Sequence, residues 1–230
     1  MPEGSSGSST TRSCTGARNS LELGIGTDKI QQDLENREYN EKRDFGKTTE
    51  PQGDTTKKKE GPGPIFVIQK HDATNLHYDF RLEIGGTLKS WSVPKGPGTD
   101  PSVKRMAIPT EDHPMEYADF EGTIPQDRYG GGTVMVWDKG SFENIKKDDG
   151  GKSISLEKSY KMGALEVKLH GKKLKGGYAL IKMKSGKMKG NWLLIKMDDD
   201  GADARRNPTG TQNKSVLSGR SLKEIEKEGS

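Results

Sequence analysis

Leu76-His77-Tyr78-Asp79-Phe80-Arg81-Leu82-Glu83-Ile84 alternates apolar and polar residues at every step. Successive side chains of a β-strand point to opposite faces, so this period-two pattern predicts a strand with one apolar and one polar face. The apolar face fixes the register, because a shift of one residue would bury all of the polar side chains. Gly85-Gly86 then supplies a two-residue hairpin turn before a second predicted strand over residues 88–93.

Further short β-rich runs flank this hairpin on both sides. They cover residues 65–68, 105–108, 133–137, 164–169, 178–183 and 192–196. Clusters of Pro and Gly separate the runs, for example over residues 94–98 and 129–132, and no amphipathic helical pattern lies between them. Many short strands punctuated in this way are typical of an antiparallel barrel or sandwich. We therefore expect one all-β core over about residues 62–200.

The composition favours one compact domain with long solvated flanks, because only 28% of the 230 residues are hydrophobic and 31% are charged. A net charge of +4 fits a polyanionic partner without requiring one. A lone cysteine, Cys14, excludes an internal disulfide framework and a thiolate zinc site. No stretch approaches the ~20 apolar residues of a membrane span, and no signal-peptide core is present. We therefore expect a cytoplasmic protein without membrane contact.

The two ends of the chain differ from the predicted core. Residues 1–26 are rich in Ser, Gly and Thr and are predicted to be disordered. Apolar residues are sparse over residues 28–41, so any helix there should be short and weakly held, and a Lys/Gly/Pro linker follows over residues 57–64. The chain is polar again after Asp198. One short helix is expected over residues 222–227, because the preceding serine and a glutamate three residues later have capping-box spacing.

The polar face of the first strand carries the candidate site. Neighbours two apart on one face of a strand lie roughly 7 Å from each other, so His77 and Asp79 can bind one metal ion. His71, at the end of the preceding strand, can supply a third ligand if the chain folds back. Two imidazoles and one carboxylate, with positions left open to water and substrate, form a common hydrolytic or redox metal site. Arg81 offers the planar guanidinium fork that matches phosphate.

The simpler interpretation of a lone His-x-Asp is the solvated face of an amphipathic strand. The scarcity of histidine argues against it, because three of only four histidines lie in or near clusters of acidic, basic and tyrosine residues. The third of these, His113, lies in the polar turn Glu111–Tyr117, where proton-transfer groups are close together. The fourth, His170, is interpreted as a surface residue at a strand end.

Two further cations are candidates for contacts with phosphate, which needs several positive groups to offset its charge. Lys95 lies in a Pro/Gly-framed loop that would hold it in a defined place, and Arg105 lies at the start of a strand. Each residue taken alone is more often a surface cation. The lysines of residues 172–189 form a basic C-terminal half, which fits a nucleic-acid backbone or a solubilising face equally well.

Long segments of the chain resemble the 3′-phosphoesterase domain of bacterial DNA ligase D. The resemblance is carried by Val67–Glu83, Leu88–Pro97, Thr110–Gly122, Tyr129–Asp138, His170–Leu174 and Asn191–Lys196. It extends without gaps over roughly residues 38–200. A match of this length is far more specific than a His-x-Asp motif.

The resemblance implies an eight-stranded β-barrel that binds a divalent ion of the Mn2+ type. The metal ligands that it implies are His71, His77 and Asp79. For phosphate binding and catalysis it implies Arg81, His113 and Tyr117, with Lys95 and Arg105 contributing to the anionic pocket. It also implies functional roles for Glu111 and for three residues of an N-terminal arm, Arg43, Asp44 and Glu50, which composition alone assigns to a linker.

The implied activity removes a terminal 3′ ribonucleoside and then the 3′-phosphate, and leaves a 3′-OH for ligation during DNA break repair by non-homologous end joining. Its substrates would be 3′ ends of DNA or of RNA–DNA primer-templates. The chain has no room for polymerase and ligase modules, so a separate DNA ligase and other end-joining proteins are the expected partners. The corresponding organisation is a disordered extension (1–37), the barrel domain with its arm (38–200) and a polar tail (201–230).

Two other functions remain open at this point. An Fe(II) oxygenase would use His77, Asp79 and His170 as its facial triad and would have little need of Arg81 or Lys95. A non-catalytic nucleic-acid-binding barrel is favoured by the basic C-terminal half. It predicts strand binding that survives both chelation and alanine at His77.

Overall fold

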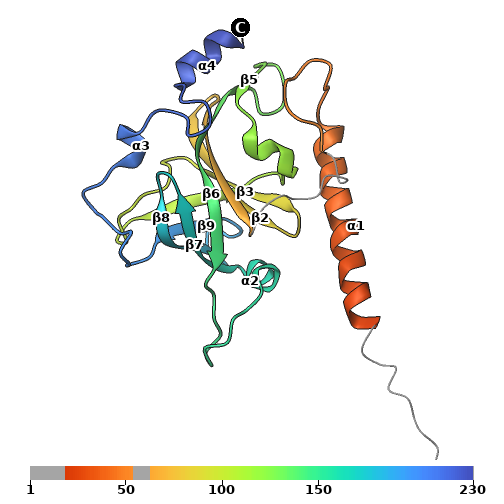
Figure 1. Ribbon diagram of the computed structural model, residues 1–230, viewed down its shortest axis with the longest axis vertical. Coiled ribbons are helices and arrows are strands. Elements are labelled where there is room, and N and C mark those ends of the chain that lie inside the picture. The colour runs from red at the N-terminus through yellow and green to blue at the C-terminus, as the bar shows by residue number, and fades with distance from the viewer. Residues whose placement is uncertain (1–18, 54–62, 230) are drawn as a thin grey trace, which may run out of the picture.

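One antiparallel sheet makes up most of the computed structural model, which describes residues 19–53 and 63–229 (Figure 1). Its strands are β1 (Ile65–Asp72), β2 (Leu76–Ile84), β3 (Thr87–Val93), β4 (Lys104–Pro109), β5 (Gly122–Ile124), β6 (Gly132–Asn144), β7 (Ala164–Gly171), β8 (Lys175–Lys182) and β9 (Trp192–Lys196). They follow one another in the order β1-β2-β3-β4-β9-β8-β7-β6, and β6 pairs back with β1. The expected closed barrel of eight antiparallel strands is confirmed, with β5 as an additional strand on β6.

Strand β6 closes the barrel because it is long enough to serve two neighbours. Its residues 133–141 pair with β1, and its residues 140–144 pair with β7. At the changeover, Gly140 lies so close to the backbone of His170 that no side chain would fit. The β1–β6 pairing also shifts register between Ile68 and Gln69, an irregularity of the kind that bends a strand.

Alternation along the strands separates the inside of the barrel from its outer face. On β2, the apolar side chains from Tyr78 to Ile84 are buried in the barrel core, as the sequence pattern predicts, whereas Leu76 at the strand start is exposed. The outer face of β1, β2, β3 and β6 is covered as well. A second apolar cluster, which includes Tyr39, Tyr117 and Phe120, packs against it. The polar side chains on this face are therefore enclosed, and the interpretation as a solvated strand face is wrong.

Helix α1 (Asn19–Glu41) runs beside the barrel (Figure 1). Residues 19–37 of the extension that was expected to be disordered belong to α1, and residues 1–18 lie outside the described residues. The disorder itself stays a prediction. The apolar pattern misses this helix because Ile30 and Leu34 face away from the barrel and are 61% and 50% exposed. The linker over residues 57–64 is described only from Gly63 onward.

Besides the buried ring of Tyr39, polar side chains hold α1 against the barrel. Gln32 Nε2 donates a hydrogen bond to the carbonyl oxygen of Gly86 at 2.9 Å. Glu35 accepts from Thr87 Oγ1 at 2.8 Å and forms an ion pair with Lys89 at 2.6 Å. Residues three and four apart lie on one face of a helix, so these contacts define the side of α1 that faces the sheet.

The described part of the polar tail beyond residue 200 contains two short helices. It contains α3 (Pro208–Thr211) and α4 (Leu222–Glu228). The predicted capping box of α4 is confirmed, with Ser221 and Glu224 as its two members. Ile225 of α4 is buried, which explains why this polar segment docks on the barrel.

Two short helices complete the structure, α2 (Leu156–Met162) and the 3-10 helix η1 (Met115–Asp119). Ser155 caps α2 by accepting from the backbone N–H of Lys158, a feature that the sequence analysis did not identify. None of the described helices combines the length and the apolar character needed to cross a bilayer.

Candidate metal centre and active site

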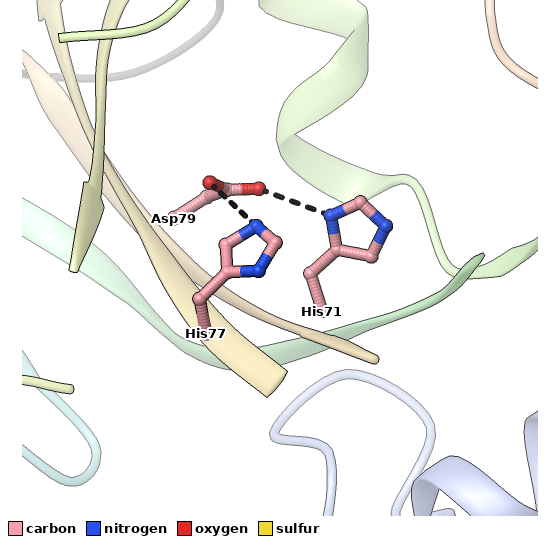
Figure 2. Close-up of side chains that lie close together, drawn as sticks. All are labelled: His71, His77 and Asp79. Atoms are coloured by element: carbon pink, nitrogen blue, oxygen red, sulfur yellow. Dashed lines mark ion pairs between the residues drawn. The ribbon is translucent and has the colours of Figure 1, made fainter. Parts of the chain in front are cut away.

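The pairing of β1 with β2 brings the three predicted metal ligands together (Figure 2). Its register places His71 directly opposite His77 and Gln69 directly opposite Asp79. Directly opposite residues share one face of a sheet, and the two imidazole rings lie 4.8 Å apart. The Asp79 carboxylate lies between them, with Oδ1 3.5 Å from His77 Nε2 and Oδ2 3.6 Å from His71 Nδ1. One ligand atom from each residue lies within 4.8 Å of the others.

These separations fit a divalent cation better than direct hydrogen bonds. N–H···O bonds have donor–acceptor distances of about 2.7–3.2 Å, shorter than both values here. Two ligands of a tetrahedral ion, each about 2.1 Å from it, lie roughly 3.4 Å apart. The Nδ1 of His77 lies 2.8 Å from the Asn75 carbonyl oxygen; as the donor of this bond it leaves the Nε2 lone pair free toward Asp79. A set of two imidazoles and one carboxylate suits zinc, manganese or iron, and it leaves coordination positions for water and substrate.

The electrostatics keep Asp79 ionised. Burial alone would raise the pKa of its carboxyl group, but the Arg81 guanidinium and the two histidine contacts lower that pKa well below its usual value. For His77, burial opposes protonation, yet Asp79 raises the pKa of the imidazole above its ordinary value. Without a metal ion, Asp79 therefore favours the protonated form of His77. Metal binding must displace this proton, since only the neutral ring can act as a ligand.

Arg81 lies at the centre of a buried polar network and is only 2% exposed. Its Nε donates to Gln69 Oε1 at 2.8 Å, and its Nη2 donates to Asp79 Oδ2 at 3.1 Å. Its Nη1 donates to Ser90 Oγ at 2.7 Å and contacts His113 Nδ1 at 2.8 Å. Four of the five guanidinium N–H groups are thus used inside the protein. Arg81 offers a phosphate its positive charge and one N–H, rather than the free fork that the sequence suggested.

The position of His113 is set by strand β3. Leu88 and His113 exchange two backbone hydrogen bonds, of 2.8 and 3.1 Å. Because a guanidinium can only donate, the contact with Arg81 requires a lone pair on Nδ1 and places the ring proton on Nε2. The same Nδ1 lies 2.8 Å from the Glu111 carbonyl oxygen, which would favour the other tautomer. Burial, together with the charges of Arg81 and Arg43, lowers the pKa of His113 well below its usual value, so the ring is neutral at pH 7.

Tyr117 packs beside His113, with ring centroids 4.5 Å apart, and the Arg81 guanidinium lies 5.1 Å from the Tyr117 ring. Burial raises the pKa of the Tyr117 phenol well above its usual value, and the positive charge of Arg81 only partly offsets this effect. Tyr117 is therefore a neutral hydrogen-bond donor at any pH near neutrality.

The N-terminal arm contributes a second buried ion network. Arg43 donates from Nε to Glu50 and from Nη1 to Glu111, both at 2.9 Å, and all three side chains are almost completely buried. The Arg43 guanidinium also stacks on Tyr39, with Cζ 3.6 Å from the ring centroid. Lys42 forms a further ion pair with Glu111 at 2.8 Å. Glu111 adjoins the segment of His113, so this network ties the arm to the side chains around Arg81.

A cavity of about 370 Å³ collects most of the predicted site residues. It is lined by Arg43, Glu50, His71, His77, Asp79, Arg81, Glu111, His113 and Tyr117. Asp44 lines an adjoining hollow that shares Arg43 and Glu50 with this cavity. Lys95 and Arg105 are not part of its lining: Lys95 is exposed in the turn after β3, and Arg105 is partly buried on β4.

Two residues of this site, Gln69 and Tyr39, were not predicted from the sequence. Gln69 is buried and joins Arg81 to the carbonyl oxygens of Tyr117 and Phe120, at 3.0 Å each. It lies two residues before His71, so the period-two rule for β1 could have identified it. No comparable signal marks Tyr39, which reaches the site only because α1 docks on the barrel.

His170 lies outside the cavity, as predicted for a surface residue. Its Nε2 contacts Glu143 at 2.8 Å, and both side chains are exposed. The candidate ligand group among the described residues contains His71 instead. The ligand arrangement expected of an Fe(II) oxygenase is therefore wrong for this protein.

The class of protein that these features define is a closed antiparallel β-barrel with a candidate two-histidine, one-carboxylate metal site on its outer face. Comparison with known families makes the assignment narrower: residues 69–182 match the model of the DNA ligase D 3′-phosphoesterase domain. Residues 69–182 thus belong to the DNA ligase D 3′-phosphoesterase domain family. The matched range includes the three candidate ligands, Arg81 and His113, whereas the N-terminal arm precedes it.

Curated relatives agree with this family. The chain is 52% identical over 143 residues to the "Multifunctional non-homologous end joining protein LigD" of Pseudomonas aeruginosa. It is 46% identical over 142 residues to the "Multifunctional non-homologous end joining DNA repair protein LigD" of Mycobacterium tuberculosis. Both matches cover 62% of this chain but only 16% and 17% of the respective relatives. The similarity therefore concerns one domain of much longer proteins.

Proposed function

We propose that this protein is a divalent-metal-dependent phosphoesterase that processes 3′ ends of nucleic acids. It removes a terminal 3′ ribonucleoside and then the 3′-phosphate, and leaves a 3′-OH that a ligase can join during non-homologous end joining. The observation that carries the proposal is the meeting of the His71–His77–Asp79 group with Arg81 and His113 in one cavity, within a barrel of this family. The relatives' names support the end-joining context.

His71, His77 and Asp79 would hold the ion, with Mn2+ as the candidate metal. When bound, a divalent ion polarises a phosphoryl oxygen and lowers the pKa of a coordinated water molecule. Arg81 supplies a fixed positive charge and one N–H to a phosphate oxygen, and its other donors keep it in place. In the tautomer that the Arg81 contact requires, His113 holds a proton on Nε2, where it can be donated to an oxygen of the substrate.

The remaining residues of the site bind the substrate or hold the site together. Tyr117 can donate its phenolic proton in a hydrogen bond to phosphate. Arg43 forms ion pairs with Glu50 and Glu111, and these pairs keep the arm against the cavity wall. Asp44, in the adjoining hollow, is exposed and pairs only weakly with Lys47, at 3.5 Å, so it is free to meet the nucleic acid. Lys95 and Arg105 are candidates for contacts with the strand outside the cavity.

The decisive experiment is a conversion assay on primer-templates that end in a 3′ ribonucleotide or a 3′-phosphate. We expect conversion to 3′-OH ends with Mn2+ and none with chelator. His77→Ala should be inactive, and His170→Ala is the matched control because His170 lies outside the cavity. Absence of any metal-dependent conversion would contradict the proposal.

The second candidate function is a non-catalytic nucleic-acid-binding barrel, which the net positive charge favours. It predicts that strand binding remains unchanged after chelation and in His77→Ala, with no change at the 3′ end of the bound strand. The cytoplasmic location and the partner ligase stay predictions.

A further inference from the structure

Tyr129 differs from the other aromatic residues in the described part of the chain because it alone is exposed. Its side chain is 55% accessible, whereas the others are buried or partly buried. Aromatic rings contribute most when they are covered, so an exposed ring beside a functional cavity is a candidate binding surface. Tyr129 lines both the cavity of the candidate metal group and the adjoining hollow of the arm.

The loop that carries Tyr129 has a closely constrained backbone. Two successive turns form it, in which Arg128 N donates to Pro125 O and Gly131 N donates to Arg128 O, both at 3.0 Å. A side chain on Gly131 would meet the Pro125 carbonyl oxygen at 2.7 Å. Gly132 has a φ of 141° and lies against the backbone of Asp72, the residue after His71. The loop is therefore held against the end of β1, and Tyr129 keeps a defined position relative to the candidate metal ligands.

Two cations lie beside the Tyr129 ring, and both also pair with Glu111. Lys42 Nζ and Arg43 Cζ each lie 5.6 Å from its centroid, and the Lys42 side chain is 46% exposed. Proteins that bind single strands combine cations that attract the backbone with aromatic rings on which bases stack. This combination occurs here at the edge of a cavity whose other residues suit a phosphate.

We propose that Tyr129 is the stacking surface for the nucleobase at the 3′ end of the bound strand. This inference rests on the proposed function, because it takes a nucleic-acid 3′ end as the ligand. Stacking on Tyr129 would hold the terminal nucleotide while its phosphate enters the cavity. Because every base presents a π-face, this contact recognises the presence of a base and not its identity.

The test compares two 3′-phosphorylated oligonucleotides that differ only in the terminal nucleotide, which either carries a base or is abasic. Dissociation constants are measured in the presence of chelator, so that the strands are not hydrolysed during the measurement. We expect the wild-type protein to prefer the strand with the base by about 5- to 100-fold. Tyr129→Phe should keep this preference, and Tyr129→Leu should remove it while binding of the abasic strand stays unchanged. Met188→Ala is the control, because Met188 is exposed and lines neither cavity.

A second readout reports on stacking itself. With 2-aminopurine as the terminal base, wild-type protein and Tyr129→Phe should quench its fluorescence on binding, and Tyr129→Leu should not. Equal affinity of the wild-type protein for both strands, or an absence of binding, would overturn the inference. An equal loss of affinity for both strands in Tyr129→Leu would also overturn the inference. It would mean that Tyr129 only holds Lys42 and Arg43 in position.

Failure of this inference and failure of the proposed function give different results. Conversion of 3′-phosphate ends to 3′-OH without a preference for the terminal base would contradict the stacking role alone. A preference for the terminal base without conversion would contradict the phosphoesterase function alone.

Discussion

Arg81 and Asp79 form a pair of opposite charges that the barrel removes almost completely from water. Each is stabilised by the other and by further polar partners, so the substitution of one leaves a buried charge without compensation. This arrangement makes the same residues important for stability and, in the proposed function, for binding an anion. For every substitution at the site, both the activity and the unfolding free energy must therefore be measured.

Arg81→Lys tests the role of the guanidinium. A lysine keeps the charge but cannot make the four hydrogen bonds of Arg81, so we expect at least a 100-fold loss of turnover and a loss of about 2–4 kcal/mol in unfolding free energy. Urea unfolding and the conversion assay measure the two effects. Mn2+ binding, measured by titration calorimetry, should persist. Loss of the metal would show instead that Arg81 mainly holds Asp79 in place.

His77→Ala tests the metal site without reference to activity. A ligand that binds only the folded state stabilises it, by about 2.7 kcal/mol at a hundredfold excess over its dissociation constant. We expect Mn2+ to raise the melting temperature of the wild-type protein and of His170→Ala, and to have little effect on His77→Ala. Equal stabilisation of all three proteins would place the ion elsewhere.

His113 predicts a pH dependence of stability. Because its pKa is lowered in the folded protein, the unfolded state binds a proton first as the pH falls below about 6.5. The unfolding free energy should therefore fall by up to about 1.4 kcal/mol per pH unit from pH 6.5 downward. The raised pKa of His77 acts in the opposite direction but above this window. Urea unfolding of the wild-type protein and His113→Asn between pH 5 and 6.5, in chelator, should show this slope only in the wild type.

At the scale of elements, the docking of α1 connects the helix to the segment of His113. Lys89 on β3 pairs with Glu35 of α1 at 2.6 Å and with Asp112 at 2.8 Å, and Asp112 adjoins His113. Burial opposes the charge on Lys89, but the two carboxylates raise the pKa of its ammonium group above its usual value. The helix is thus held by a largely buried ion triad in addition to the buried ring of Tyr39.

Two positions on α1 test this attachment. Glu35→Ala should lower the unfolding free energy by about 1–3 kcal/mol, because Lys89 and Thr87 lose a partly buried partner. Arg37→Ala is the matched control on the same helix. Both side chains of its ion pair with Glu41 are exposed, so this pair should contribute less than about 0.5 kcal/mol to the unfolding free energy. Equal effects of the two substitutions in urea unfolding would contradict the docking of α1 through Glu35.

At the scale of the whole molecule, the chain beyond residue 200 packs against the barrel. The Gln212 carbonyl oxygen accepts from Trp137 Nε1 at 2.6 Å and from Lys173 Nζ at 3.1 Å. Burial lowers the pKa of Lys173 to about 8, so this ammonium group depends on such partners to stay charged. The tail is therefore an integral part of the fold.

Truncation after Asp203 tests the contribution of the tail. It would leave the buried indole N–H of Trp137 and the Lys173 ammonium without the partners that Gln212 supplies, at a cost of about 1–3 kcal/mol for each. We expect a loss of at least about 2 kcal/mol in unfolding free energy, measured by urea unfolding. Asn213→Ala is the control, because its bond to Lys70 is exposed. An unchanged unfolding free energy after truncation would show that the tail is dispensable.

The sequence by itself determined the β2 strand, its two faces and the candidate ligands His77 and Asp79. Period-two alternation depends only on the geometry of a strand, so it can be read without knowledge of the partners. Most other strands and the capping box of α4 were found for the same reason, because they depend on local chemistry. The family resemblance added the roles of His113 and Tyr117 and the membership of the arm.

Only the tertiary structure decided the rest, because it depends on contacts between residues far apart in the chain. The β1–β2 register placed His71 opposite His77, and the pairing of β6 with β1 closed the barrel. The docking of α1 through polar side chains is invisible to a hydrophobic pattern. The second apolar cluster, which includes Tyr39 of α1, covers the outer face of the sheet. The strand face that sequence alone could interpret as solvated is thereby buried, which gives Arg81 and Asp79 their low-dielectric surroundings.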